Sequence, residues 1–262
     1  KGQYLEGFRD YEERYSPKRV TKDRTILPAI FVPRWHGEIL NGKTILIWQE
    51  QGVGDAIQSA GFAKQLQDMG AKVWFATIES LKPVLTTCPW IERVVLKTEV
   101  PLLKGFDYWV MALSLPYLLE VTPQNYVSSS PYLLADPAKQ KTWKTKLEQL
   151  DLGVQETEKA LDFKSNVLTA KPSLKVGLVW AGNPDHVNDK YRSMRSTDLL
   201  PLANIEGVKW CSLQIDSSKS GELPLEFHAQ NLGQHLHDYS DTAALLKELD
   251  LLVTVDTSIA HL

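Results

Sequence analysis

Three short polar segments of this sequence each follow an apolar run, and their side chains could act on a hydroxyl or a phosphate. The first segment, residues 50–55, contains Gly52, Gly54 and Asp55. A carboxylate can take a proton as a general base, and two glycines let the backbone turn tightly and a ligand approach closely. The segment lacks both the dinucleotide-binding and the P-loop glycine patterns. Spacing favours a helix-capping role for Asp55 about as strongly as a catalytic one.

The second segment, residues 183–193, lies between an apolar run and a predicted helix. It carries Asn183 and Ser193 together with two cations, Lys190 and Arg192. A cation beside the edge of a sheet suits a phosphate, and a guanidinium can bind one with two hydrogen bonds. For Lys190 we favour an ordinary surface charge.

The third segment follows the apolar run 249–255 and contains Asp256, Thr257, Ser258 and His261. Where a parallel strand opens into a helix, free N–H groups and a partial positive charge attract a phosphate. Taken alone, these residues fit a helix cap and a core histidine better than a binding site. The segment therefore becomes informative only together with the other two.

Alternating strands and helices must position these segments. In the first half, the apolar periodicity predicts strands at 44–49, 72–78, 93–96 and 106–113, with helices at 56–66 and 80–87. In the second half, it predicts strands at 176–180, 208–214 and 251–255, with a helix at 197–203. This alternation predicts parallel sheets with right-handed crossovers, and ligands bind at the carboxyl edge of such sheets.

The sequence is therefore predicted to be an α/β protein with two sheet-containing domains. A helix at 138–150 and a polar, weakly periodic stretch follow the first series of strands. We predict a helical segment at 1–34, a first domain at 35–152, a linker at 153–173 and a second domain at 174–262. With three predicted strands, the second domain is expected to be incomplete, so this chain should bind its ligand weakly and turn over poorly.

Composition excludes several classes of protein. The 262 residues carry a net charge of −3, which is not the basic field that duplex nucleic acid requires. No apolar run approaches the roughly 20 residues that span a bilayer. Cys88 and Cys211 lack metal-ligand spacing and fit buried thiols in a reducing compartment. We predict a cytoplasmic protein with no nucleic-acid partner and no membrane span.

The three segments, in this order, resemble the bacterial heptosyltransferase-like glycosyltransferases of glycosyltransferase family 9, in particular the branch with N-terminal tetratricopeptide repeats. The resemblance runs from about Trp35 onward and is carried by residues 44–63, 176–193, 210–214 and 241–262. Residues 2–15 resemble the closing helix of a repeat array, in which each unit has about 34 residues. A plain amphipathic helix docked on the first domain is the alternative.

The resemblance implies a GT-B architecture, in which two Rossmann-like domains face a cleft. It implies a nucleotide-diphosphate sugar donor, a saccharide or protein acceptor, Asp55 as general base, and neither metal nor cofactor. The repeats would recruit a protein partner. The family pattern has a lysine near Arg192 and a glycine at Ser258, so heptose is not implied as the donor sugar. The substrate-binding residues that it implies are Gly52, Gly54, Asn183, Lys190, Arg192, Ser193, Asp256, Thr257, Ser258 and His261.

Two other classes of function stay open. One is a non-catalytic binding module with the same fold, and the other is a different sugar-nucleotide enzyme such as a two-domain epimerase. Release of free nucleoside diphosphate only in the presence of an acceptor would separate glycosyl transfer from both.

Overall fold

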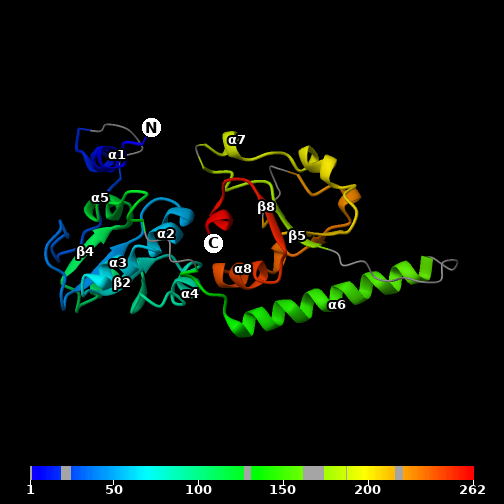
Figure 1. Cartoon of the computed structure of the whole chain (residues 1–262), viewed down its shortest axis with the longest axis horizontal. Coiled ribbons are helices and arrows are strands. Elements are labelled where there is room, and N and C mark those ends of the chain that lie inside the picture. Colours follow the sequence, from blue (N-terminus) through cyan, green and yellow to red (C-terminus); the bar gives the residue numbers. More distant parts are fainter. Residues whose placement is uncertain (1, 19–24, 127–130, 162–173, 187, 216–220) are drawn as a thin grey trace. The chain divides into compact units, whose positions relative to one another are not determined.

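The computed structural model describes residues 2–18, 25–126, 131–161, 174–186, 188–215 and 221–262. These residues form two compact units, the first comprising Lys1–Leu134 with His261–Leu262 and the second Ala135–Ala260. Each unit is built on its own four-stranded parallel sheet (Figure 1). The predicted α/β fold with two parallel sheets is therefore confirmed.

The first sheet has the strand order β3-β2-β1-β4. Its strands are continuous apolar runs, as expected where both faces of a parallel sheet are covered. The predicted run at 106–113 forms a shorter strand, because the chain turns into the 3-10 helix η3 (Ala112–Ser114). The four strands are β1 (Thr44–Trp48), β2 (Lys72–Thr77), β3 (Arg93–Leu96) and β4 (Tyr108–Met111).

The helix predicted over 56–66 is two helices, α2 (Val53–Ala60) and α3 (Ala63–Asp68). At the break, the N–H groups of Gly61 and Phe62 each bond to the carbonyl three residues back, which tightens the turn. The predicted helix at 80–87 is shorter, as α4 (Lys82–Leu85). The remaining helical pieces of this unit are α1 (Tyr4–Tyr11), η1 (Glu12–Tyr15), η2 (Val100–Leu102) and α5 (Leu115–Leu118).

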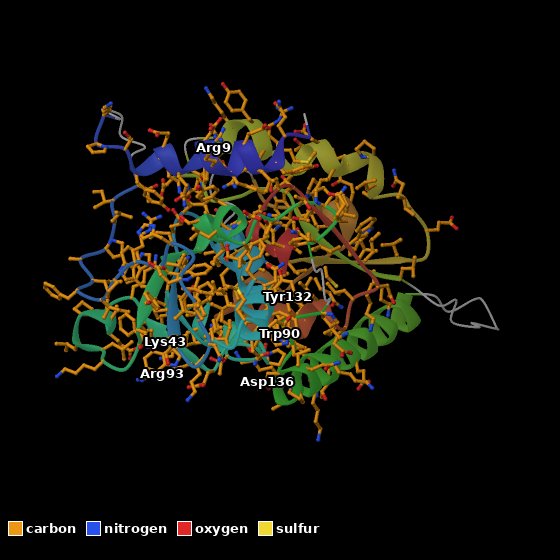
Figure 2. All side chains as sticks on the ribbon, turned by 60° about the vertical axis from the view of Figure 1, so that its left-hand side comes forward. Arg9, Lys43, Trp90, Arg93, Tyr132 and Asp136 are labelled. Carbon is orange, nitrogen blue, oxygen red and sulfur yellow. The ribbon has the colours of Figure 1, made fainter. Side chains whose placement is uncertain are left out.

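One face of the first sheet packs against the chain that precedes β1. Leu46, Trp74 and Trp109 belong to a buried cluster that Ile30 and Val32 cover. Two cations, Lys43 and Arg93, lie at the amino ends of β1 and β3 on one side of the unit (Figure 2). They are therefore at the opposite edge of this sheet from residues 50–55, which follow the carboxyl end of β1.

The second sheet repeats this order as β7-β6-β5-β8. It has four strands where the apolar pattern predicted three, because β7 has only two residues and no apolar run to reveal it. The helix predicted at 197–203 is the 3-10 helix η4 (Ser196–Leu202). The strands are β5 (Leu174–Val179), β6 (Val208–Ser212), β7 (Gln230–Asn231) and β8 (Leu251–Thr254). The other helical pieces are α7 (Asp189–Arg192), η5 (Leu225–Phe227), η6 (Gly233–His235), α8 (Tyr239–Leu246) and η7 (Ser258–His261).

The long helix α6 (Pro137–Leu161) belongs to the second unit. Trp143 and Leu147 pack into the same buried cluster as Cys211 and Leu245, on one face of the second sheet. This packing places the boundary between the units at residues 134/135, whereas the sequence predicted the first domain to continue to 152. The predicted linker at 153–173 begins inside α6, and its residues 162–173 lie outside the described residues.

Candidate functional site

The shared strand order creates one topological switch point in each sheet. In the first sheet β1 lies between β2 and β4, and in the second β5 lies between β6 and β8. The loops after these paired strands diverge at the carboxyl edge, which is where open α/β sheets bind ligands. The three polar segments follow β1, β5 and β8, so each lies at a switch point.

Asp55 lies in the first turn of α2, the helix that follows β1. Its carboxylate oxygen Oδ2 accepts a hydrogen bond of 2.9 Å from the backbone N–H of Gly52, the residue that precedes the helix. The side chain is half-buried. Asp55 is therefore a helix-capping carboxylate at the switch point, and this placement is compatible with both interpretations of the sequence.

Gly54 and His261 are close neighbours within the first unit. A Cβ added at Gly54 would lie 2.6 Å from Cδ2 of the His261 ring, so a larger residue at this position would require the ring to shift. His261 Nδ1 lies 2.6 Å from the side-chain nitrogen Nε2 of Gln58 on α2. The structure thus places His261 beside the first turns of α2.

The first switch point also holds a buried ion pair that the sequence pattern did not reveal. The side chains of Arg14 and Glu50 are each 2% exposed. Arg14 donates from Nε and Nη2 to the two carboxylate oxygens of Glu50, at 3.0 and 2.9 Å. The N–H of Leu113 donates to Glu50 at 2.8 Å. The partners are 36 residues apart, and no local spacing pattern could have paired them.

Further polar groups surround this pair and stabilise its charges. Burial opposes the charged form of Arg14, but its bonds to Glu50 outweigh burial and raise the pKa of the guanidinium. Tyr15 donates to Glu50 at 3.0 Å, and burial, followed by the charge of Glu50, raises the pKa of its hydroxyl. Ser114 accepts from Arg14 at 3.0 Å and from Arg34 at 3.1 Å. The region is therefore a buried network of opposite charges.

In the second unit, Arg192 and Asp256 are brought together although they follow different strands. Nη1 of Arg192 donates to the carbonyl oxygen of Asp256 at 3.3 Å. Its Nε lies 3.6 Å from Asp189 and makes no hydrogen bond within the described part of the chain. The guanidinium lies directly over Gly182, where an added Cβ would be 2.8 Å from Nη2. The loops after β5 and β8 thus meet at an arginine.

Ser193 organises the loop after β5. Its hydroxyl accepts from the N–H of Gly182 at 2.9 Å and donates to Asp189 at 2.6 Å. Asn183 is exposed, and its side-chain oxygen accepts from the N–H of Asp185 at 2.9 Å, which forms a local turn. Lys190 is exposed, with its ammonium group 4.7 Å from the Tyr191 ring centroid. Ser193 and Asn183 therefore shape this loop, while Lys190 lies on its surface.

The residues after β8 form the four-residue 3-10 helix η7. Ser258 is fixed by a hydrogen bond of 2.7 Å to the hydroxyl of Tyr239 on α8. The hydroxyl of Thr257 lies 3.4 Å from that of Thr254, at the end of β8. Thr257 and Ser258 directly follow Asp256, so both hydroxyls belong to the loop that Arg192 contacts.

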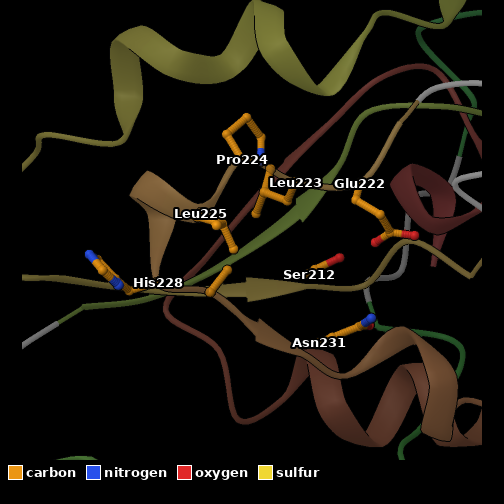
Figure 3. Close-up of a pocket in the computed structure, with 8 residues that line it drawn as sticks. Ser212, Glu222, Leu223, Pro224, Leu225, His228 and Asn231 are labelled. Atoms are coloured by element: carbon orange, nitrogen blue, oxygen red, sulfur yellow. The ribbon is translucent and has the colours of Figure 1, made fainter.

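A pocket of about 400 Å³ lies alongside β7, lined mostly by the residues that precede this strand (Figure 3). Ser212 ends β6 and Asn231 ends β7. Glu222 and Asn231 lie toward one end of the pocket, and His228 lies at the other. This combination of apolar and polar groups is typical of small-molecule pockets. Its lining residues are Ser212, Glu222, Leu223, Pro224, Leu225, His228, Ala229 and Asn231.

Neither a cluster of metal ligands nor a membrane-crossing helix occurs among the described residues. No three His, Cys, Asp or Glu side chains in this part of the chain lie close enough together to hold a metal ion. Each of its helices is too short or too polar to cross a membrane.

The two parallel sheets with their shared strand order define a GT-B-like α/β fold. The chain is similar to the glycosyl transferase family 9 structure from Veillonella parvula DSM 2008, with a TM-score of 0.55 and 11% identity over 87% of this chain and 79% of that one. It is also similar to the E. coli ADP-heptose lps heptosyltransferase II, with a TM-score of 0.53 and 12% identity over 82% of this chain and 80% of that one. At these identities the similarity shows the fold.

Among curated proteins, the chain is similar to protein FlbA from Caulobacter vibrioides, with 26% identity over 281 residues. The alignment includes 96% of this chain but only 42% of FlbA, so the chain spans about two fifths of this relative. No model of a known protein family matches the chain.

Proposed function

We propose that this chain belongs to a glycosyltransferase that moves a sugar from a nucleotide-diphosphate donor to a hydroxyl of a saccharide or protein acceptor. One observation carries the proposal. Arg192, from the loop after β5, bonds to Asp256, in the loop after β8, at the switch point of the second sheet. The fold similarity to glycosyltransferases supports this choice among the ligands that an arginine could bind.

The donor would lie on the second unit. The bond from Arg192 to Asp256 is long, at 3.3 Å, so the guanidinium can exchange it for two charge-assisted bonds to a diphosphate. The hydroxyls of Thr257 and Ser258 would orient the same group. The nucleoside would occupy the pocket at β6 and β7, where Glu222 and Asn231 can bind ribose hydroxyls. Fixed charges and dipoles would then stabilise the leaving diphosphate, as expected for electrostatic preorganisation.

The acceptor would bind at the first switch point, with Asp55 as general base. As the acceptor oxygen bonds to the anomeric carbon, its proton passes to the Asp55 carboxylate. The bond from that carbon to the diphosphate oxygen breaks, and the nucleoside diphosphate leaves with the electron pair. Oδ2 already accepts from Gly52, so proton transfer would use Oδ1 while the cap holds the side chain in place.

The test compares the wild type with Asp55→Asn in the full-length protein. We expect the variant to lose about 10²–10⁴-fold in acceptor-dependent release of nucleoside diphosphate, which is the usual contribution of a general base. Nucleotide affinity should stay unchanged. Asp68→Asn is the matched control, because Asp68 is an exposed helical aspartate paired with Lys64 on α3. Equal loss of transfer and nucleotide binding in Asp55→Asn would indicate misfolding instead.

A non-catalytic binding module is the second candidate, and the capping bond of Asp55 favours it. The bond to Gly52 accounts for the carboxylate without any chemistry. A module would bind nucleotide without releasing diphosphate when an acceptor is added. An epimerase would convert the sugar nucleotide with no acceptor present. The N-terminal repeat array, the protein partner and the cytoplasmic location remain predictions from the sequence.

A further inference from the structure

We propose that residues 11–15 position the loop 49–52, from which α2 and its Asp55 begin, with Arg14 as the principal positioning residue acting through Glu50. The importance of this loop for catalysis rests on the proposed function. The positioning itself can be measured without any substrate.

Glu50 is the first anchor of the loop. Its carboxylate accepts from Arg14 through two nitrogens, from the hydroxyl of Tyr15 and from the N–H of Leu113. These donors come from the N-terminal segment and from the residues just after β4. Because Glu50 is the second residue after the end of β1, these bonds fix where the loop begins.

The residues on either side of Glu50 are anchored as well. Gln49 accepts from the hydroxyl of Thr77 at 2.6 Å, at the end of β2. Gln51 has a φ of 54°, in the left-handed region that side chains other than glycine rarely adopt. Its side chain donates to the hydroxyl of Tyr11 at 2.5 Å, so this residue too is tied to the segment 11–15. Of these three anchored residues, Glu50 and Gln51 therefore have bonding partners among residues 11–15.

The chemistry of the buried pair favours positioning over stability. Replacing a buried ion pair with uncharged groups of similar size often leaves stability unchanged or increases it, because desolvation offsets the attraction. Arginine and carboxylate bind in one planar, two-bonded arrangement, which adds geometric specificity. Arg14 and Glu50 adopt this arrangement next to the proposed catalytic loop. The ion pair of Arg14 and Glu50 thus serves to fix the geometry of the loop that follows β1.

The experiment uses the double variant Arg14→Met with Glu50→Gln in the full chain. Removing Arg14 alone would leave a buried carboxylate unpaired, which can prevent folding. The introduced glutamine would keep an acceptor for Leu113 and Tyr15 while both charges are lost. We expect a folded protein with amide exchange of residues 50–55 accelerated about tenfold or more, and with exchange in β2 unchanged. Arg14→Lys, with Glu50 intact, should also accelerate this exchange, since an ammonium group cannot bind both carboxylate oxygens in the planar arrangement of a guanidinium.

Leu85→Ala is the control for stability, because Leu85 is fully buried and lies on α4, which follows β2. It should lower the unfolding temperature without selectively exposing residues 50–55. Unchanged exchange of residues 50–55 in the double variant would overturn the proposal. So would acceleration that Leu85→Ala reproduces in the same residues.

Transfer kinetics distinguish this inference from the proposed function. If the loop positions Asp55, the double variant should show a lower kcat with unchanged nucleotide affinity. A wild-type protein without transferase activity would refute the proposed function, while faster exchange in the double variant would still support the positioning role.

Discussion

Gly182→Ala should weaken nucleotide binding because the added methyl group displaces the side chain of Arg192, which is itself unchanged. A Cβ at residue 182 would lie 2.8 Å from Nη2 of Arg192 and 3.0 Å from its Cζ. The optimal van der Waals separation between such heavy atoms is about 3.5–4.0 Å, so the guanidinium of Arg192 must move by roughly 0.5–1 Å. Its bond to Asp256 is already 3.3 Å long and would break. Gly182 does not have a positive φ, so alanine adds no backbone strain.

The expected loss of affinity follows from the hydrogen bonds that the displaced Arg192 would no longer make to the diphosphate. Hydrogen bonds to a charged group contribute about 1.5–3 kcal/mol, and each 1.4 kcal/mol is about tenfold in affinity. Gly182→Ala should therefore raise the Kd for a nucleoside diphosphate roughly ten- to a hundredfold. The free energy of unfolding should change by less than about 1 kcal/mol, because the loss of unfolded-state entropy offsets the displaced contact.

The assay is calorimetric titration with ADP, UDP and GDP on a double-mutant cycle of Gly182→Ala and Arg192→Ala. If Gly182 matters only because it leaves room for Arg192, the glycine substitution should have no further effect in the Arg192→Ala background. Gly7→Ala is the glycine control, since an added Cβ there meets nothing within 4 Å. Additive effects of the two substitutions would refute the reasoning. Full affinity in Gly182→Ala would refute it too.

Two further predictions concern the stability of the second unit. Gly233→Ala should lower the free energy of unfolding by about 1–3 kcal/mol in a denaturant titration, because its Cβ would overlap the carbonyl oxygen of Gln214; an unchanged midpoint would contradict this. Burial opposes ionisation of Asp238, but bonds from Lys139 and the N–H of Asp241 outweigh it and hold the pKa of Asp238 below its ordinary value. A depressed folded pKa contributes stability above the unfolded value of about 3.9, and this stability is lost as the pH falls through the folded pKa. Asp238→Asn should therefore be less stable at neutral pH and lose less stability below about pH 4; parallel acid-unfolding curves would exclude this role.

Local apolar patterns were sufficient for most of the fold. The runs that form β1, β5 and β8 are apolar enough to identify strands, and the polar segments 50–55, 183–193 and 256–261 follow them along the chain. Asp55, Arg192 and Asp256 could therefore be assigned to sheet edges, since the carboxyl ends of parallel strands share one edge. Features without a local pattern were missed. The two-residue strand β7 has no apolar run, and α6 belongs to the second unit because Trp143 and Leu147 pack there.

The details of the candidate sites depend on residues that are distant in the sequence. Arg14 pairs with Glu50 across 36 residues, and Arg192 bonds to Asp256 across 64. Hydrophobic periodicity acts over a few residues and specifies an element, whereas a hydrogen bond forms only where folding brings two groups within about 3 Å. The amino-acid order therefore determined the strands and the edge at which chemistry could occur. Packing of the folded chain selected which charges meet there, because burial makes an unpaired charge too costly to retain.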